Sequence, residues 1–132
     1  MSAAVEAWHQ LVRTGNPAGL DALLADEVVF VSPVVHTPQH GKPVTKAYLS
    51  AAFAVFFNPS FRYVREIVGP RDAMLEFETT IDGVLVNGVD IIRWDAQDRI
   101  VEFKVMVRPL KAIQLIHARM GAMLAAGAGR AA

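Results

Sequence analysis

The segment from residue 61 to residue 108 constrains the fold most, because four β-branched and aromatic runs follow one another with only short turns between them. The turns are rich in Gly, Pro and Asp, and such short connections join antiparallel neighbours but cannot carry a parallel crossover. The segment therefore predicts an antiparallel meander. Its strands are expected at residues 61–68, 73–81, 84–94 and 99–108.

Helical periodicity dominates the rest of the chain, apart from a β-branched strand expected at residues 28–31 and a loop over residues 33–42. Asn16-Pro17 is an N-cap followed by proline at the first helical position, and Pro109 opens the last amphipathic segment. This order predicts an α+β fold in which one sheet face packs on helices. Helices are expected at residues 3–14, 17–25 and 43–57, and from residue 109 onward.

The chain has 132 residues, which suffices for one domain with a substantial core. We expect a single domain over residues 1–124 and a flexible tail over residues 125–132. Thirteen basic and thirteen acidic residues give no net charge, so neither a nucleic acid nor a membrane partner is expected. The start of the chain shows no export signal, which favours a cytoplasmic protein. No glycine-rich phosphate loop or nucleophile elbow occurs, and no cofactor or metal is expected.

Residues 84–94 alternate in a way that makes both sheet faces largely apolar. Gly88, Asp90, Ile92 and Trp94 fall on one face, and the intervening positions fall on the other. The helices can cover only one of these faces. A second copy of the chain would cover the other, so we expect a homodimer through the outer sheet face.

Asp90 is the unusual residue of this strand, because it lies between Val89 and Ile91 on the face that should be buried. A buried carboxylate needs hydrogen-bond donors or a raised pKa. Two interpretations stay open. Asp90 is either the acid of a functional site, or a structural carboxylate satisfied by donors such as the Trp8 indole and the Ser32 hydroxyl.

The stretch VDIIRWDAQDRIVEF, preceded by LLADEVVFVSP and by an HG before the third helix, resembles the nuclear transport factor 2-like superfamily over about residues 3–110. That group includes ketosteroid isomerase, SnoaL-like polyketide cyclases and limonene epoxide hydrolase. The resemblance implies a cone-shaped (cystatin-like) fold, in which a curved antiparallel sheet wraps around the N-terminal helices, encloses a pocket and is followed by a C-terminal helix. It also implies a dimer, whereas the reaction stays open because this fold hosts many functions.

Within this resemblance, Asp90 corresponds to the protonated acid of the isomerase oxyanion hole. Trp8 stands where the isomerase has a hydrogen-bonding tyrosine, and Ser32 stands where it has the general base. An indole cannot polarise a carbonyl as a phenol does, and a serine without a partnered base cannot shuttle a proton at neutral pH. The chain is therefore not expected to be a true ketosteroid isomerase. The epoxide hydrolase residues are replaced as well, by Glu76-Phe77-Glu78 and by Val105.

Other polar residues complete the candidate site. His36 and His40 lie in the loop at the expected pocket mouth, where an imidazole could act as acid or base beside Asp90. Glu76 and Glu78 are expected to face outward and to pair with Arg93 or Lys104. His9 and His117 are expected to be structural or exposed. The predicted pocket wall consists of Trp8, Ser32, Val34, Phe53, Phe57, Ile92, Trp94, Phe103, Val105 and Val107.

Two functions from different classes follow. The first is an isomerase-, cyclase- or hydrolase-like enzyme that binds a small apolar or polycyclic carbonyl compound, with Asp90 as general acid or oxyanion donor. The second is a non-catalytic ligand-binding or assembly module that keeps the pocket and lacks the catalytic set. The missing tyrosine and general base favour the second, and a buried acid in an apolar pocket favours the first.

Overall fold

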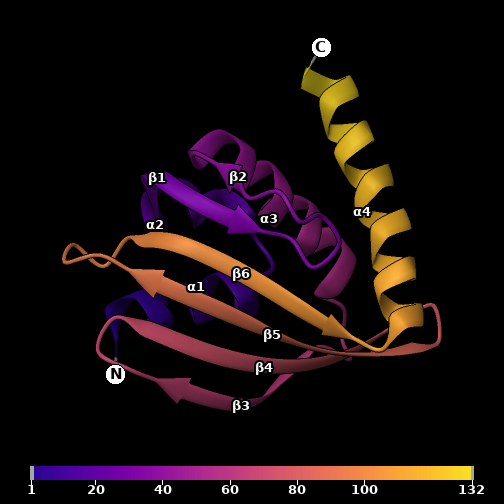
Figure 1. Cartoon of the computed structure of the whole chain (residues 1–132), viewed down its shortest axis with the longest axis horizontal. Coiled ribbons are helices and arrows are strands. Elements are labelled where there is room, and N and C mark those ends of the chain that lie inside the picture. Colours follow the sequence, from indigo (N-terminus) through magenta and orange to yellow (C-terminus); the bar gives the residue numbers. More distant parts are fainter. Residues whose placement is uncertain (1, 132) are drawn as a thin grey trace.

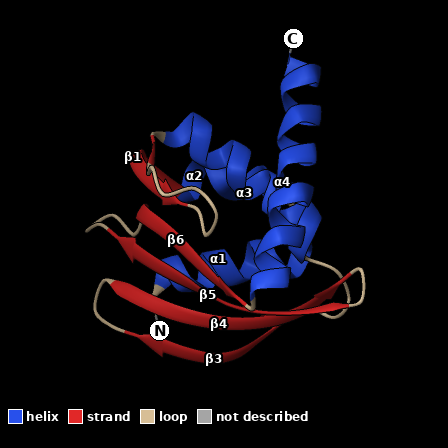
Figure 2. Ribbon diagram, turned by 45° about the vertical axis from the view of Figure 1, so that its right-hand side comes forward, coloured by secondary structure: helices blue, strands red, loops and turns tan. Residues whose placement is uncertain are grey.

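The computed structural model of the chain describes residues 2–131. A six-stranded sheet curves around the first three helices, and α4 stands beside α3 at one end of the sheet (Figure 1). Figure 2 shows the same layers with the helices gathered on one side of the sheet. In chain order the elements are α1 (Ala3–Thr14), η1 (Pro17–Gly19), α2 (Leu20–Leu23), β1 (Leu24–Val31), β2 (Gln39–His40), α3 (Lys42–Phe56), β3 (Arg62–Val68), β4 (Asp72–Ile81), β5 (Val84–Trp94), β6 (Ile100–Arg108) and α4 (Leu110–Ala131).

The sheet has the strand order β2-β1-β6-β5-β4-β3. Strands β3 to β6 pair antiparallel with their neighbours in sequence, which confirms the predicted meander. Asp82 and Gly83 both have positive φ angles between β4 and β5, as a two-residue type I′ turn requires. The sheet is mixed, because β1 pairs parallel with β6 and brings Phe30 opposite Phe103. The strand predicted at residues 28–31 is present and begins earlier, at Leu24, but its parallel pairing was not predicted. The short β2, within the loop expected at residues 33–42, was not predicted either.

Helix α1 has the predicted bounds because both of its ends are capped. The Ser2 side chain accepts from backbone N–H groups of the first turn, and Gly15 closes the helix with φ of 65°. The next helix starts at Pro17 as predicted, with the Asn16 side chain as its cap, but it is a 3₁₀ turn followed by a single α-helical turn. It ends early because Leu24 already pairs with β6 as the first residue of β1.

Helix α4 continues to Ala131, so residues 125–131 are helical where a tail was expected. The flexibility of this end stays a prediction, and residue 132 lies outside the described residues. In both views the C-terminal part of α4 extends beyond the other elements (Figures 1 and 2). Of the helices within residues 2–131, none is both long and apolar enough to span a lipid bilayer.

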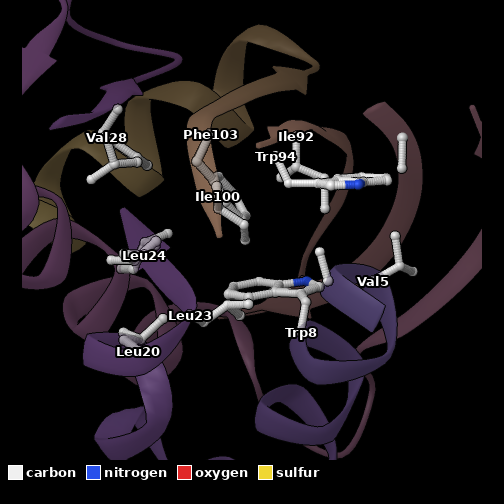
Figure 3. Close-up of a cluster of buried hydrophobic side chains, with 14 of the residues drawn as sticks. Val5, Trp8, Leu20, Leu23, Leu24, Val28, Ile92, Trp94, Ile100 and Phe103 are labelled. Carbon is white, nitrogen blue, oxygen red and sulfur yellow. The ribbon is translucent and has the colours of Figure 1, made fainter. Parts of the chain in front are cut away.

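The inner sheet face divides into two ends that differ in packing. At one end, which we name the packed end, Leu24, Val28, Ile92, Trp94 and Ile100 are almost fully buried in one cluster (Figure 3). The other end, under α3 and α4, holds a second cluster that includes Phe56, Phe77 and Ile116. Gly88 belongs to this end, where a Cβ atom would lie 2.4 Å from the Phe77 ring and 2.8 Å from the Met106 carbonyl oxygen. A glycine is therefore needed where the Phe77 ring crosses β5.

Candidate functional site

A cavity of about 170 Å³ lies between the inner sheet face, α3, α4 and the segment that follows β1. We name this region of the inner face the open end. Aromatic and aliphatic side chains form most of the wall, and the polar groups are few. Such a lining binds apolar molecules and uses its polar groups to orient them. The lining residues are Trp8, Phe30, Ser32, Pro33, Val34, Val35, Tyr48, Leu49, Ala52, Phe53, Phe56, Phe57, Phe61, Phe77, Asp90, Phe103, Val105, Ile116, His117, Met120, Gly121 and Leu124.

Asp90 is the one carboxylic acid in this wall among the residues whose side chains are described. It lies on β5 opposite Leu75 and Val105 and is only 6% exposed. Its Oδ2 atom accepts a hydrogen bond of 2.7 Å from the Tyr63 hydroxyl. Its Oδ1 atom accepts no hydrogen bond from the side chains described, which are those of residues 2–127. Oδ1 is also not one of the fully enclosed polar atoms that lack a partner, so it is accessible from the cavity. One carboxyl oxygen is therefore held by the protein, and the other faces the cavity.

Tyr63 connects Asp90 to helix α1. The Tyr63 hydroxyl accepts a hydrogen bond of 2.8 Å from Trp8 Nε1 while it donates to Asp90. The Trp8 ring packs edge-on against Phe53 and is tilted against Phe103. These two hydrogen bonds link Trp8, Tyr63 and Asp90 in series. The indole N–H of Trp8, which could otherwise bind a ligand, is therefore already in use. Trp8 presents an apolar ring to the cavity, and Tyr63 lies behind Asp90 rather than in the wall.

The surroundings of Asp90 favour its protonated form. Burial raises the pKa of the Asp90 carboxyl from 3.8 to about 7, even though the Tyr63 hydrogen bond acts in the opposite direction. Burial also raises the pKa of Tyr63 well above 10, with the nearby Asp90 charge as the second cause, so the phenol keeps its proton. Near neutral pH the Asp90 carboxyl can therefore either donate or accept a proton at the atom that faces the cavity.

Ser32 lines the cavity at the end of β1, where its Oγ accepts a hydrogen bond of 3.1 Å from the Val34 backbone N–H. Its hydroxyl proton can still be donated to a ligand. Ser32 makes no side-chain contact with Asp90 or Trp8 among the hydrogen bonds of residues 2–131. The interpretation of Asp90 as a structural carboxylate named Trp8 or Ser32 as the donor, and this part of it is wrong. The donor to Asp90 is Tyr63.

The structure brings most of the predicted wall together and leaves three residues out. Ile92 and Trp94 point to the same face as Asp90 but belong to the packed end (Figure 3). Val107 packs against the second cluster, beside the wall rather than in it. The predicted site residues that line the cavity are Trp8, Ser32, Val34, Phe53, Phe57, Asp90, Phe103 and Val105.

The two loop histidines are not part of the cavity wall. His36 and His40 are both exposed, and His40 belongs to β2, which pairs with Val29 at the sheet edge. This pairing places His40 at the sheet edge, whereas Pro33, Val34 and Val35 of the same loop line the cavity. His117 is exposed, as one of its two expected roles required, and it also lines the cavity. His9 Nε2 contacts a carboxyl oxygen of Glu66, and the His9 ring packs edge-on against Tyr63, which is a structural role.

The two glutamates of β4 face outward as predicted, since Leu75 and Phe77 take the inner face. Their partners differ from the prediction. Glu78 pairs with Arg62, and Glu76 pairs with Arg65 and accepts a hydrogen bond from Asn87. The reason is register, because Glu76 and Glu78 lie directly opposite residues of β3.

Sequence reasoning missed Tyr63, because a β-bulge changes the phase of β3. Near the turn, Val68 and Glu66 pair with Ala73 and Leu75, so simple alternation would place residues 64 and 62 on the inner face. The register shifts between Tyr63 and Arg65, and Tyr63 lies opposite the inward Phe77. The only sequence signal was a tyrosine in β3, which β4 separates from the strand that carries Asp90.

Comparisons with known proteins identify the family. The SnoaL-like domain matches residues 5–103, and the chain belongs to this family. It is similar to a steroid delta-isomerase from Pseudomonas aeruginosa, with 36% sequence identity and a TM-score of 0.91. The similarity covers 96% of this chain and 93% of the isomerase chain. A bacterial protein with a cystatin-like fold from Silicibacter pomeroyi DSS-3 is 29% identical over 92% of this chain and 85% of its own, with a TM-score of 0.85.

A more distant similarity shows the fold alone. A de novo designed protein with a curved β-sheet has 14% identity and a TM-score of 0.70, over 89% of this chain and 98% of the designed one. No protein of curated function matches the chain. The similarity to the Silicibacter pomeroyi protein confirms the expected cystatin-like fold.

Proposed function

We propose that this protein binds a small, largely apolar carbonyl compound in the cavity and that protonated Asp90 donates a hydrogen bond to the carbonyl oxygen. One observation carries the proposal: a buried carboxyl with a pKa raised to about 7 has one oxygen on Tyr63 and the other toward an apolar cavity. A protonated acid in such surroundings stabilises negative charge that develops on a carbonyl oxygen.

The cavity size limits the ligand. Its volume of about 170 Å³ is close to the roughly 150 Å³ of an apolar cavity that holds benzene. One or two rings therefore fit within it, and a larger molecule would extend through the mouth. The aromatic wall favours a flat ligand, because offset and edge-on contacts with rings such as Phe53 and Phe103 add to apolar burial.

The similarity to a steroid delta-isomerase supports carbonyl chemistry without supporting the same reaction. Movement of a double bond requires a group that removes a proton from carbon as well as an acid at the oxygen. Here the wall carries Asp90 as its single carboxyl among the described side chains, and Ser32 has no basic partner. Asp90 as general acid in an isomerase-, cyclase- or hydrolase-like reaction is the activity we propose.

Isothermal titration with 1-tetralone, a bicyclic ketone, tests this function. Asp90→Asn keeps the shape of the side chain but removes the acid, and we expect an affinity loss of about tenfold or more. Asp98→Asn, at an exposed turn outside the cavity, is the matched control and should not change affinity. Unchanged 1-tetralone binding and turnover in Asp90→Asn would overturn the proposal.

The non-catalytic module is the second candidate. It is supported by Asp90 being the single carboxyl of the wall among the described side chains, with the His117 imidazole at the solvent-exposed rim. Proton NMR in D₂O separates the two functions. If Asp90 polarises the carbonyl of bound 1-tetralone, a buffer base should remove the protons next to that carbonyl faster than from free 1-tetralone, and Asp90→Asn should abolish this acceleration. Binding at wild-type affinity without exchange would assign the non-catalytic function.

We also propose that the outer sheet face forms a homodimer. Its centre carries the exposed apolar side chains of Ile67, Met74 and Met106. Around them lie charged side chains of both signs, which form ion pairs such as Arg65–Glu76 and Arg93–Glu102. An apolar centre with a polar rim of mixed charge is typical of interfaces, and its near-neutral rim does not repel a second copy.

Native mass spectrometry tests the dimer. Met74→Lys places a charge at the centre of the face and should convert a wild-type dimer into a monomer. Leu110→Lys, at an exposed apolar position on α4, is the control and should stay dimeric. A monomeric wild type at micromolar concentration would contradict the proposal.

A further inference from the structure

Helix α4 forms one rim of the cavity. His117, Gly121 and Leu124 line it from a single stripe of the helix, at spacings of four and three residues. His117 and Gly121 are both exposed as well as part of the wall, so the cavity meets solvent along this stripe. The opposite rim includes Val34 and Val35, from the segment after β1.

Gly121 has no structural reason to be glycine. It lies inside a continuous 22-residue helix, where glycine is among the least favourable residues. A Cβ atom built on Gly121 meets nothing within 4 Å. By contrast, a Cβ at Gly88 would meet Phe77 and backbone, and one at Gly19 would meet Leu11 at 2.5 Å. Close packing therefore explains Gly88 and Gly19 but leaves Gly121 unexplained.

We propose that Gly121 is a specificity-determining position that keeps the cavity mouth open. The missing side chain leaves a gap through which the ligand enters and through which an apolar chain longer than the cavity extends along α4. This inference rests on the proposed carbonyl ligand and adds its shape: a ring that lies near Asp90, with an alkyl chain that leaves past Gly121. Met120 and Leu124 flank the gap and provide apolar contacts for that chain.

Ligand length is the first test, with alkyl phenyl ketones as probes. Gly121→Leu adds a side chain at the gap, where its Cβ atom meets nothing within 4 Å. We expect it to weaken hexanophenone binding by about tenfold or more, since each methylene that loses burial costs about fourfold in affinity. Binding of acetophenone should change by less than about twofold. Gly127→Leu is the matched control, because Gly127 lies on the same helix with equally open space and does not line the cavity. Equal effects on both ketones, or equal effects of both variants, would overturn the proposal.

Access to Trp8 is the second test, and it needs no ligand. Trp8 lines the cavity, whereas Trp94 lies in the packed end, so Trp94→Phe makes Trp8 the single tryptophan, whose emission is excited selectively over that of tyrosine. In that background, acrylamide should quench Trp8 less in Gly121→Leu than in Gly127→Leu. Identical quenching would overturn the role of Gly121. If no ketone binds the wild type but quenching still differs, Gly121 is the entrance and the proposed carbonyl ligand is wrong.

Discussion

The two ends of the inner sheet face use the same strands for different purposes. At the packed end, Ile92 and Trp94 of β5 are buried in one cluster with Ile100 and do not line the cavity. At the open end, one step along the same face of β5, Asp90 borders a cavity of about 170 Å³. Asp90 therefore lies at the boundary, and the face that a residue points to does not determine whether it binds a ligand or fills the core.

This boundary explains why a carboxyl can be retained inside the fold. A carboxyl deeper in the packed end would have no donor and no solvent, and one farther along the open end would be hydrated. At the boundary, Tyr63 satisfies one oxygen, the cavity receives the other, and burial holds the pKa near 7. Packing at one end and space at the other thus create the chemistry of Asp90 together.

The largest expected effect that tests this boundary is a pH dependence of stability. Between pH 3.8 and about pH 7, Asp90 is ionised in the unfolded chain but protonated in the folded one, so the folded state binds the extra proton. The free energy of unfolding should therefore fall as pH rises through this range, by on the order of 4 kcal/mol, and then stay level. Urea unfolding of the wild type and of Asp90→Asn measures the effect as a difference.

Other titrating groups cancel in that difference, because the two proteins share them. The Asp90→Asn variant lacks the titrating carboxyl, so its stability relative to wild type should rise from acidic to neutral pH. Parallel stability curves would show that Asp90 titrates as an exposed acid does and would place it outside the boundary.

A matched pair of valines gives the next effect. Val28 is fully buried in the packed end, whereas Val105 lines the cavity and is half-buried. Val28→Ala should lower the free energy of unfolding by about 2–3 kcal/mol, and Val105→Ala by only about 1 kcal/mol, because a wall beside existing space has fewer contacts to lose. Urea unfolding of both variants measures the two losses, provided that the dependence of the free energy of unfolding on urea concentration is the same in both. Equal losses would mean that the open end is packed as tightly as the other.

Local patterns predicted the elements because local chemistry forms them. The Asn16-Pro17 start and the Asp82-Gly83 turn each act within a few residues, and the structure retains both. Alternation likewise predicted that Asp90 points inward. These signals are read along the chain, and they establish the meander, the inner face and the buried acid.

The features that sequence did not predict depend on contacts between distant segments. The parallel pairing of β1 with β6 has no local signature. The bulge in β3 that turns Tyr63 inward is one extra residue in an otherwise regular strand. The separation of Ile92 from the cavity wall follows from sheet curvature, which brings α1 onto one end of the face and α3 and α4 over the other (Figure 2).

A smaller effect concerns the hydrogen-bond chain at the boundary. Tyr63→Phe removes the donor to Asp90 and the acceptor of Trp8 Nε1, and we expect a loss of about 1–2 kcal/mol in the free energy of unfolding. The Asp90 pKa should also rise further, because the Tyr63 hydrogen bond lowers it. Tyr48→Phe, which alters a cavity phenol without a hydrogen bond to Asp90, is the control. Carbon-13 NMR of the Asp90 carboxyl measures this pKa. An unchanged pKa in Tyr63→Phe would contradict the hydrogen bond from Tyr63 to Asp90.

The smallest effect is expected at the histidines and separates the open end from its surroundings. His36→Ala and His40→Ala should leave 1-tetralone affinity within about twofold of wild type, because both side chains are exposed and outside the wall. His117→Ala removes a rim residue and should shift affinity by no more than about threefold, since solvated rim contacts contribute little. Titration of the three variants in parallel provides the measurement. A tenfold loss in either loop variant would show that the segment between β1 and α3 closes over the ligand, and the open end would then include a part that this structure holds at the sheet edge.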